Sequence, residues 1–156
     1  MSVSGKIKRF LEQEKINYQI LEHNPAFTAL EIAQAQHLPG HQVVKTVVVD
    51  ADGKQILCVL PSTHKIDFDR LKKMLNAQNV ALTNETQVGK LFPEYEIGAM
   101  PPFGRTPDLK VYVDKDLAEN ESIAFNAGTH VDMLKIRFKD FVKIATPTFG
   151  TFGIHI

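Results

Sequence analysis

Residues 43–60 decide the fold of this chain, and they read VVKTVVVDADGKQILCVL. Apolar residues fill both faces of the first half, as in a strand that is buried on both sides. Asp52 and Gly53 form a dipeptide that is typical of a tight hairpin turn. A second apolar run follows the turn at once. We therefore predict a β-hairpin with strands at 43–50 and 55–60.

Further helix and strand patterns flank this hairpin. Helical spacing of apolar residues predicts helices at 4–16, capped by Ser4, and at 28–36, 67–75, 85–91 and 139–145. Extended patterns predict strands at 18–21, 80–82, 110–114, 122–126 and 132–137. Because strands outnumber helices and do not alternate strictly with them, we predict an α+β fold with a mixed, largely antiparallel sheet flanked by helices. The aromatic tail, 146–156, could cover the domain's own core or that of a partner.

The composition is that of an ordinary globular protein. The chain has 156 residues, of which 44% are hydrophobic and 23% charged, so we expect a single domain over 1–156. No apolar run approaches the ~20 residues of a membrane span, and the first residues lack the apolar segment of a secretory signal. A lone cysteine, Cys58, excludes an internal disulfide and a cysteine-built zinc site. We expect a cytoplasmic protein with no membrane partner.

The charge balance restricts the kind of nucleic-acid partner. Lys plus Arg total 18 and Asp plus Glu total 18, so the formal net charge is zero. A protein that holds nucleic acid mainly through phosphates usually carries a basic excess. Any nucleic-acid partner must therefore be held over a small footprint or by a local patch.

Lys45 is an irregularity within the apolar hairpin. Alternation places it on the same strand face as Val43, Val47 and Val49. An ammonium is rarely buried without a partner, because its desolvation is costly. Either Lys45 snorkels to water from near the strand end, or it reaches into a polar cleft that receives a phosphate or a carboxylate. The strand pattern alone does not choose between these two interpretations.

The segment 98–104, which reads GAMPPFG, is a second irregularity. Its two glycines permit positive φ, and its two prolines stiffen the middle and remove two N–H donors. It is either a simple chain reversal or a rigid wall against a small ligand. Motifs for serine hydrolases, P-loops and dinucleotide binding are absent from the sequence. The apolar surroundings of Cys58 argue against a thiolate nucleophile.

Six histidines are present, and no pair has the His-x-x-x-His spacing of a helical metal site with an acidic residue between the two histidines. His130, in a turn that Gly128 opens, could bind a ligand or shuttle a proton, although such a histidine is more often only a turn residue. A small metal-dependent hydrolase using His23, His64 or His130 is therefore only a rival hypothesis. We expect no metal and no cofactor.

Together these motifs resemble the YbaK family, which includes the editing domain associated with prolyl-tRNA synthetase. The resemblance covers roughly residues 20–145, and it rests on His23 with Thr28, the strand 43–46, the segment 98–104 and the turn 128–130. It implies a mixed sheet that encloses a small pocket. It also implies hydrolysis in trans of wrongly charged aminoacyl-tRNA.

The resemblance further implies roles for individual residues. Lys45 matches the family's functional lysine, so we expect it to be catalytic. The expected substrate-binding residues are His23, Thr28, Thr46, Gly98, Met100, Pro101, Pro102, Phe103, Gly104 and His130. The segment 100–103 departs from the loop of the cysteine-specific members, so alanine, cysteine, serine and threonine all stay open as the amino acid removed.

An aminoacyl ester is already activated, so an editing site needs no strong protein nucleophile. Water or a hydroxyl of the substrate's terminal ribose would attack, and Lys45 would bind the phosphate or ester end of the terminal adenosine. The expected partners are the acceptor end of an aminoacyl-tRNA and a cognate aminoacyl-tRNA synthetase. The alternative is a non-catalytic module that binds a nucleotide or an RNA end in the same pocket.

Overall fold

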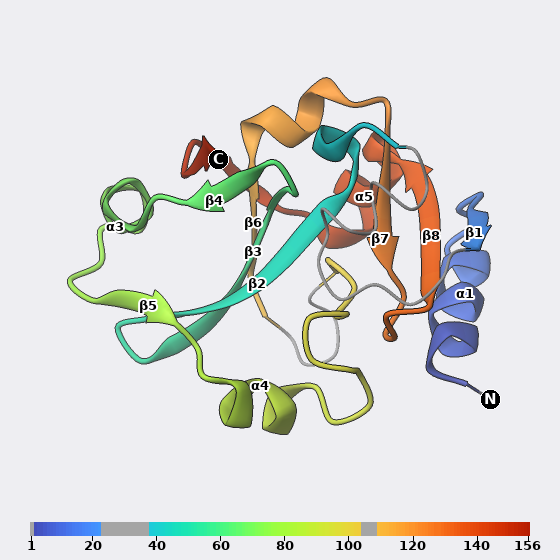
Figure 1. The fold of residues 1–156 in the computed structure, drawn as a ribbon, viewed down its shortest axis with the longest axis horizontal. Helices are drawn as coiled ribbons and strands as arrows, with labels where there is room; N and C mark the ends of the chain where they lie inside the picture. The colour runs from blue at the N-terminus through green and yellow to red at the C-terminus, as the bar shows by residue number, and fades with distance from the viewer. Residues whose placement is uncertain (1, 23–37, 104–108) are drawn as a thin grey trace.

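The predicted hairpin lies inside the largest sheet of the computed structural model (Figure 1). Its strands, β2 (Val44–Ala51) and β3 (Lys54–Pro61), pair antiparallel. The turn residues Asp52 and Gly53 have φ of 52° and 87°, as the favoured two-residue hairpin turn requires. The structure describes residues 2–22, 38–103 and 109–156.

Three further strands extend this sheet on both sides of the hairpin. β5 (Val80–Leu82) pairs antiparallel with β2, whereas β6 (Val111–Asp114) runs parallel to β3 and β9 (Thr148–Gly150) runs parallel to β6. The strand order is therefore β5-β2-β3-β6-β9. β9 lies in the tail, where the sequence pattern predicts no strand.

A second sheet is antiparallel and contains β1 (Gln19–Glu22), β8 (Asp132–Arg137) and β7 (Ser122–Asn126) in the order β1-β8-β7. It meets the hairpin at one parallel bridge between Val43 and Ala124. These two sheets confirm the prediction of a mixed, largely antiparallel α+β fold.

A third, two-stranded sheet was not predicted. It contains β4 (His64–Ile66) and β10 (Gly153–His155), which pair antiparallel. β4 follows β3 after a short turn, and β10 comes from the tail, so this sheet ties the end of the chain to the end of the hairpin.

The described residues form four α-helices. In α1 (Val3–Gln13) the cap is Ser2, which accepts the Gly5 N–H, whereas the predicted cap Ser4 is buried. The helices α3 (Phe68–Leu75), α4 (Glu85–Leu91) and α5 (Phe138–Ala145) confirm three other predictions to within a residue at each end. Two short 3₁₀ helices, η1 (Gly40–Gln42) and η2 (Lys115–Glu119), precede β2 and follow β6. The predicted helix at 28–36 lies outside the described residues.

The larger apolar cluster brings one face of the large sheet together with the second sheet, α1 and α5. It includes Val48 and Val59 from the hairpin, Phe125 from β7 and Phe141 from α5. Val44 belongs to the same cluster. Because alternate residues of a strand share a face, this is also the face of Thr46.

A second cluster covers the opposite face of the hairpin. It contains Cys58 and Leu60 of β3, Leu71 of α3 and Phe152 of the tail. Phe152 is fully buried, so the tail covers the domain's own core. Burial also raises the pKa of the Cys58 thiol to about 12, which agrees with the prediction that Cys58 is a core residue.

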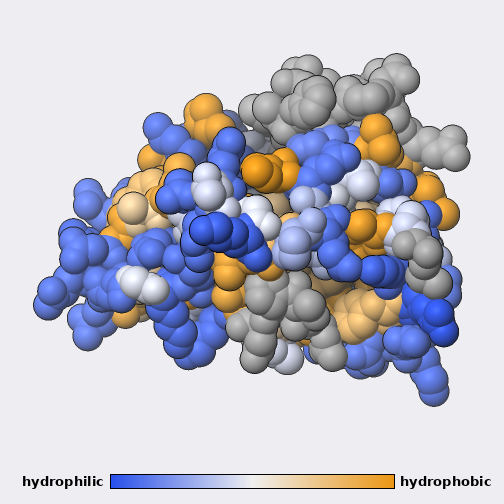
Figure 2. All heavy atoms as spheres, turned by 90° about the horizontal axis from the view of Figure 1, so that it is seen from below, coloured by the Kyte–Doolittle hydropathy of each residue, from blue (hydrophilic) through white to orange (hydrophobic). Residues whose placement is uncertain are grey.

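The face of the molecule seen from below (Figure 2) is mostly polar. Figure 2 shows a face dominated by hydrophilic side chains, with hydrophobic ones in scattered groups. In the ranges that the structure describes, the large hydrophobic residues with exposed side chains are spread along the chain: Ile20, Leu82, Ile97, Val131, Phe149 and Ile156. No helix in the described part of the chain has both the length and the apolar character needed to cross a membrane.

Candidate active site

Lys45 lies in β2 opposite Leu60 of β3, so its side chain leaves the sheet on the face that α3 and the tail cover. Its Nζ donates a hydrogen bond to the backbone carbonyl of His64, at 2.6 Å. The side chain is partly buried, and desolvation lowers the pKa of Lys45 below its ordinary 10.5. Among the described residues, no carboxylate lies within ion-pair distance of this ammonium.

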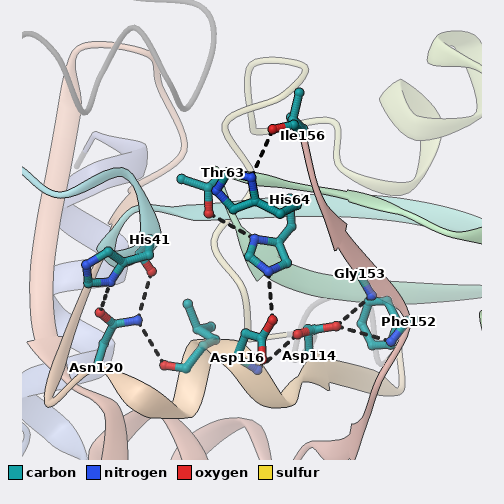
Figure 3. A network of polar contacts seen from close by, with 11 residues as sticks. His41, Thr63, His64, Asp114, Asp116, Asn120, Phe152, Gly153 and Ile156 are labelled. Carbon is teal, nitrogen blue, oxygen red and sulfur yellow. Dashed lines mark hydrogen bonds and ion pairs between the residues drawn. The ribbon is translucent and has the colours of Figure 1, made fainter.

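The residue that accepts this bond, His64, belongs to a polar network (Figure 3). Its Nε2–H donates to the Asp116 carboxylate at 2.7 Å, and its Nδ1 lies 2.9 Å from the Thr63 hydroxyl oxygen. Asp114 accepts the Asp116 N–H through Oδ1 and the Phe152 and Gly153 N–H groups through Oδ2. The network therefore connects β4, η2 and β10.

His64, Asp114 and Asp116 also form a group of the kind that can hold a metal ion, because their ligand atoms lie within 4.8 Å of one another. The hydrogen bonds above already account for this arrangement. His64 Nε2 is directed at Asp116, and both oxygens of Asp114 accept backbone N–H groups. Of the other histidines in the rival metal hypothesis, His23 lies outside the described residues.

The start of β2 is held by a second set of polar contacts. Ser62 is fully buried; its N–H donates to the Val43 carbonyl at 2.8 Å, and its hydroxyl donates to the Gly40 carbonyl. The Asn120 amide donates to the carbonyl of His41, and the His41 ring donates back to Asn120 at 2.6 Å (Figure 3). η1 and the strand that carries Lys45 are thus fixed to the β3–β4 turn and to η2.

The segment 98–104 meets the turn that contains His130, as far as the structure describes it. The Glu96 N–H donates to the Gly128 carbonyl at 2.8 Å, and the Gly128 N–H donates to the Ala99 carbonyl at 2.9 Å. His130 donates from Nε2 to the Ile97 carbonyl at 2.7 Å. Gly98 has a φ of 86°, and a Cβ added there would lie 3.4 Å from the His130 ring. Two motifs from distant parts of the sequence are therefore joined by hydrogen bonds into one unit, which we call the wall of Gly98 and His130.

The middle of this segment faces inward. Met100, Pro101, Pro102 and Phe103 are all buried. The Phe103 ring meets that of Phe125 edge-on, with 5.1 Å between ring centroids. Met100 and Phe103 belong to the larger cluster, which packs on the face of β2 opposite to Lys45. These side chains therefore support the wall from the core.

The predicted site residues do not all lie together. Lys45 lies on one face of β2 and Thr46 on the other. Gly98 contacts the turn of His130, and residues 100–103 are buried. Within the described ranges, no hydrogen bond joins Lys45 to the segment 98–103 or to His130. His23, Thr28 and Gly104 lie outside the described residues. Substrate binding by these residues stays a prediction.

A cavity of about 890 Å³ lies at the other end of the hairpin from Lys45. It is lined by Lys54 at the start of β3, Lys110 just before β6, and Thr146 just after α5. Phe103 contributes to its wall. Because Lys45 opposes Leu60 near the far end of β3, this cavity is separate from Lys45.

Asn126 is a candidate that sequence reasoning missed. It ends β7, and its buried Oδ1 has no hydrogen-bond partner among the residues that the structure describes, which is rare for a buried acceptor. The isolated parallel bridge between Val43 and Ala124 comes two residues before Lys45 in one segment and two residues before Asn126 in the other. The available signal was an amide that directly follows the apolar run 123–125.

Comparison with known proteins assigns the family. The aminoacyl-tRNA editing domain model matches residues 23–144. The prolyl-tRNA editing protein ProX of Acetoanaerobium sticklandii is 27% identical over 148 residues, which cover 91% of this chain and 90% of that protein. The multifunctional Ser/Thr-tRNA deacylase ProXp-y of Escherichia coli is 25% identical over 147 residues, which cover 91% of this chain and 87% of that protein.

A solved structure agrees with this assignment at the level of the fold. The crystal structure of a proposed trans-editing enzyme for prolyl-tRNA synthetase superposes with a TM-score of 0.86 and 20% identity, covering 99% of this chain and 98% of that one. The resemblance to the YbaK family is thereby confirmed. Since the family model spans most of its length, the chain belongs to the aminoacyl-tRNA editing domain family.

Proposed function

We propose that this protein is a trans-acting aminoacyl-tRNA deacylase, which hydrolyses the ester between a tRNA and a small, wrongly attached amino acid. Support comes from the family match and from two relatives whose names state prolyl-tRNA editing and Ser/Thr-tRNA deacylation. The structural observation that carries the proposal is the Lys45 ammonium. It is partly buried, and among the described residues its acceptor is one backbone carbonyl.

Lys45 has the donors needed to bind an anionic substrate end. An ammonium has three N–H donors, and one of them is directed at the His64 carbonyl. The other two can bind a phosphate or ester oxygen of the terminal adenosine by charge-assisted hydrogen bonds. Such bonds gain strength where water is partly excluded, so the desolvation that lowers the pKa of Lys45 also strengthens its hold on the substrate.

Asn126 supplies an acceptor for the other end of the substrate. Its Oδ1, which accepts no hydrogen bond from any described residue, can take one from the α-ammonium of the esterified amino acid. An unpaired buried acceptor is destabilising on its own, and a bound donor relieves that penalty. The wall formed by Gly98 and His130 would then limit the size of the amino acid. The discrimination would be imperfect, because one methylene group changes the relative rate by only ~10–200-fold.

The reaction is an ordinary ester hydrolysis. Water adds to the carbonyl carbon, and negative charge develops on the carbonyl oxygen, where the Lys45 ammonium can stabilise it. The bond from the carbonyl carbon to the ribose oxygen then breaks, and that oxygen takes a proton, which the neighbouring ribose hydroxyl can relay. Attack by the ribose hydroxyl itself would only move the acyl group between ribose oxygens, so water completes the reaction. The products are a free amino acid and an uncharged tRNA.

The partner implied is the acceptor end of an aminoacyl-tRNA, delivered from a synthetase that makes the charging error. A chain with zero formal net charge suits a partner that is gripped over a small footprint. We take the whole of 1–156 as one editing domain.

A deacylation panel tests the proposal. Purified protein would be incubated with tRNAs carrying alanine, cysteine, serine, threonine or proline, alongside the variants Lys45→Ala and Lys54→Ala. Lys54 is an exposed lysine at the other end of the same hairpin and serves as the matched control. We expect turnover with the natural chain and with Lys54→Ala, and none with folded Lys45→Ala. Binding without turnover of any substrate would favour the non-catalytic module instead.

A further inference from the structure

The carbonyl that holds Lys45 is on a strand outside the large sheet. His64 opens β4, whose pairing partner in the described part of the chain is β10. His155 lies opposite His64, and the Ile156 N–H donates to the Thr63 carbonyl at 2.9 Å. The last residues of the chain thus run alongside the acceptor of the lysine.

Asp114 fixes the start of β10. Its carboxylate is almost fully buried, and Oδ2 accepts the N–H of Phe152 at 3.1 Å and that of Gly153 at 2.6 Å. A Cβ added to Gly153 would lie 2.9 Å from Asp114 Oδ2 and 3.4 Å from the His64 Cβ. The 2.9 Å approach to Asp114 is too close for a Cβ, so glycine lets β10 lie this near the carboxylate that anchors it.

Asp116 fixes the side chain of the same histidine. Its carboxylate accepts from His64 Nε2 at 2.7 Å (Figure 3). The His155 ring meets the His64 ring edge-on, with 5.6 Å between ring centroids. The backbone of His64 is thus held by β10, and its side chain is held by η2. Within the described part of the chain, no hydrogen bond or ion pair joins the ammonium to β10 or to Asp116, so both can act on Lys45 only through the His64 carbonyl.

We infer that β10 and Asp116 form a positioning device for Lys45, which fixes the carbonyl that aims the ammonium at the substrate. The inference rests on the proposed function, because it takes Lys45 as the catalytic group. It assigns a role to the tail beyond covering the core: the end of the chain sets the geometry of the active site. Gly153 and Asp116 are accordingly positioning residues.

Two variants and one control test the inference. Gly153→Ala crowds the Asp114 carboxylate and so disturbs the start of β10, whereas Asp116→Ala removes one hydrogen bond from a half-exposed side chain and leaves the core untouched. Gly89→Ala in α4 is the control, since a Cβ there meets nothing within 4 Å. Each would be assayed for single-turnover deacylation and substrate affinity, with thermal melting to verify folding. Lys45→Ala sets the floor of activity.

We expect Gly153→Ala to lower the deacylation rate by about 100-fold, the effect of a misplacement near 1 Å. Asp116→Ala should lower it about tenfold, as expected for one lost charge-assisted hydrogen bond. Asp116→Asn keeps an acceptor for His64 and should restore most of the rate. Gly89→Ala should match the natural chain, and affinity for the tRNA should change little in all of them.

A spectroscopic readout separates positioning from general weakening of the fold. The ¹⁵Nζ–H signal of Lys45, assigned by its loss in Lys45→Ala, should be visible in the natural chain and in Gly89→Ala, because a hydrogen-bonded ammonium exchanges slowly with water. It should weaken in Gly153→Ala and Asp116→Ala. If these two variants stay folded with full activity and an unchanged signal while Lys45→Ala is inactive, the positioning role is wrong and the proposed function stands. Full activity in Lys45→Ala would overturn the catalytic role of the lysine itself.

Discussion

Gly98 and Gly53 offer a matched pair of substitutions that isolates the contribution of the segment 98–104. Both glycines have positive φ, 86° and 87° respectively, so an alanine is strained by the same amount at each position. The surroundings differ. A Cβ at Gly53 meets nothing within 4 Å, whereas one at Gly98 would lie 3.4 Å from the His130 ring, an ordinary contact without a clash.

The expected magnitudes follow from this geometry. The left-handed conformation costs an L-residue about 1–2 kcal/mol, and 1 kcal/mol shifts the Tm of a chain of this size by about 2–4 °C. Both Gly53→Ala and Gly98→Ala should therefore lower the Tm by about 2–8 °C and by similar amounts. Only Gly98→Ala places a new methyl group against His130, and one methylene group in a pocket changes rates by about tenfold or more.

The measurement is a pair of thermal melts and a pair of deacylation rates on the tRNA that the natural chain hydrolyses best. We expect the Gly98→Ala rate to fall at least tenfold while the Gly53→Ala rate stays within about twofold of the natural value. Equal rates in the two variants would show that the wall of Gly98 and His130 does not touch the substrate. A large difference between the two Tm values would refute the strain argument.

Three other predictions concern buried groups. Burial lowers the pKa of Lys45 below 10.5, so between the lowered pKa and 10.5 the unfolded chain binds more protons than the folded one. The free energy of unfolding should therefore rise with pH in that window. Urea melts of Lys45→Met at a series of pH values should lack this rise. Cys58 has a pKa raised to about 12 and is fully buried, so iodoacetamide at pH 8 should leave it unlabelled by mass spectrometry until urea unfolds the protein. Phe152→Ala should lower the free energy of unfolding by about 3–5 kcal/mol in urea titrations, and a loss below about 1 kcal/mol would mean that the tail does not close the second cluster.

The hairpin could be predicted because its determinants are local. Val47 and Val48 point to opposite faces, and Asp52 with Gly53 specifies the turn, so both strands and their register follow from one continuous stretch. The same holds for α3, where Asp67 accepts two N–H groups of the first turn. The sequence pattern predicts the cap of α1 at Ser4, whereas the structure has it at Ser2. A serine at either position fits the cap pattern, and only the burial of Ser4 distinguishes them.

The strands β4, β9 and β10 could not be predicted because three residues carry too little periodicity. β10 exists because Asp114, 38 and 39 residues away, accepts the N–H groups of Phe152 and Gly153. A carboxylate that caps a distant backbone leaves no mark on the local pattern at either end. The sequence therefore leaves open where the tail packs, although in the structure β9, β10 and Phe152 all fix it to the domain.

The candidate site shows the same division between local and distant causes. Lys45 stands out in the sequence because a charge within a valine strand breaks a local rule, and such breaks are expected at functional sites. Its acceptor, the His64 carbonyl, is a backbone group that every residue possesses, so the identity of the acceptor could not be predicted from residue type. The position of that carbonyl depends on the pairing of β4 with β10. By our inference this pairing, rather than any single side chain, sets the orientation of the Lys45 ammonium.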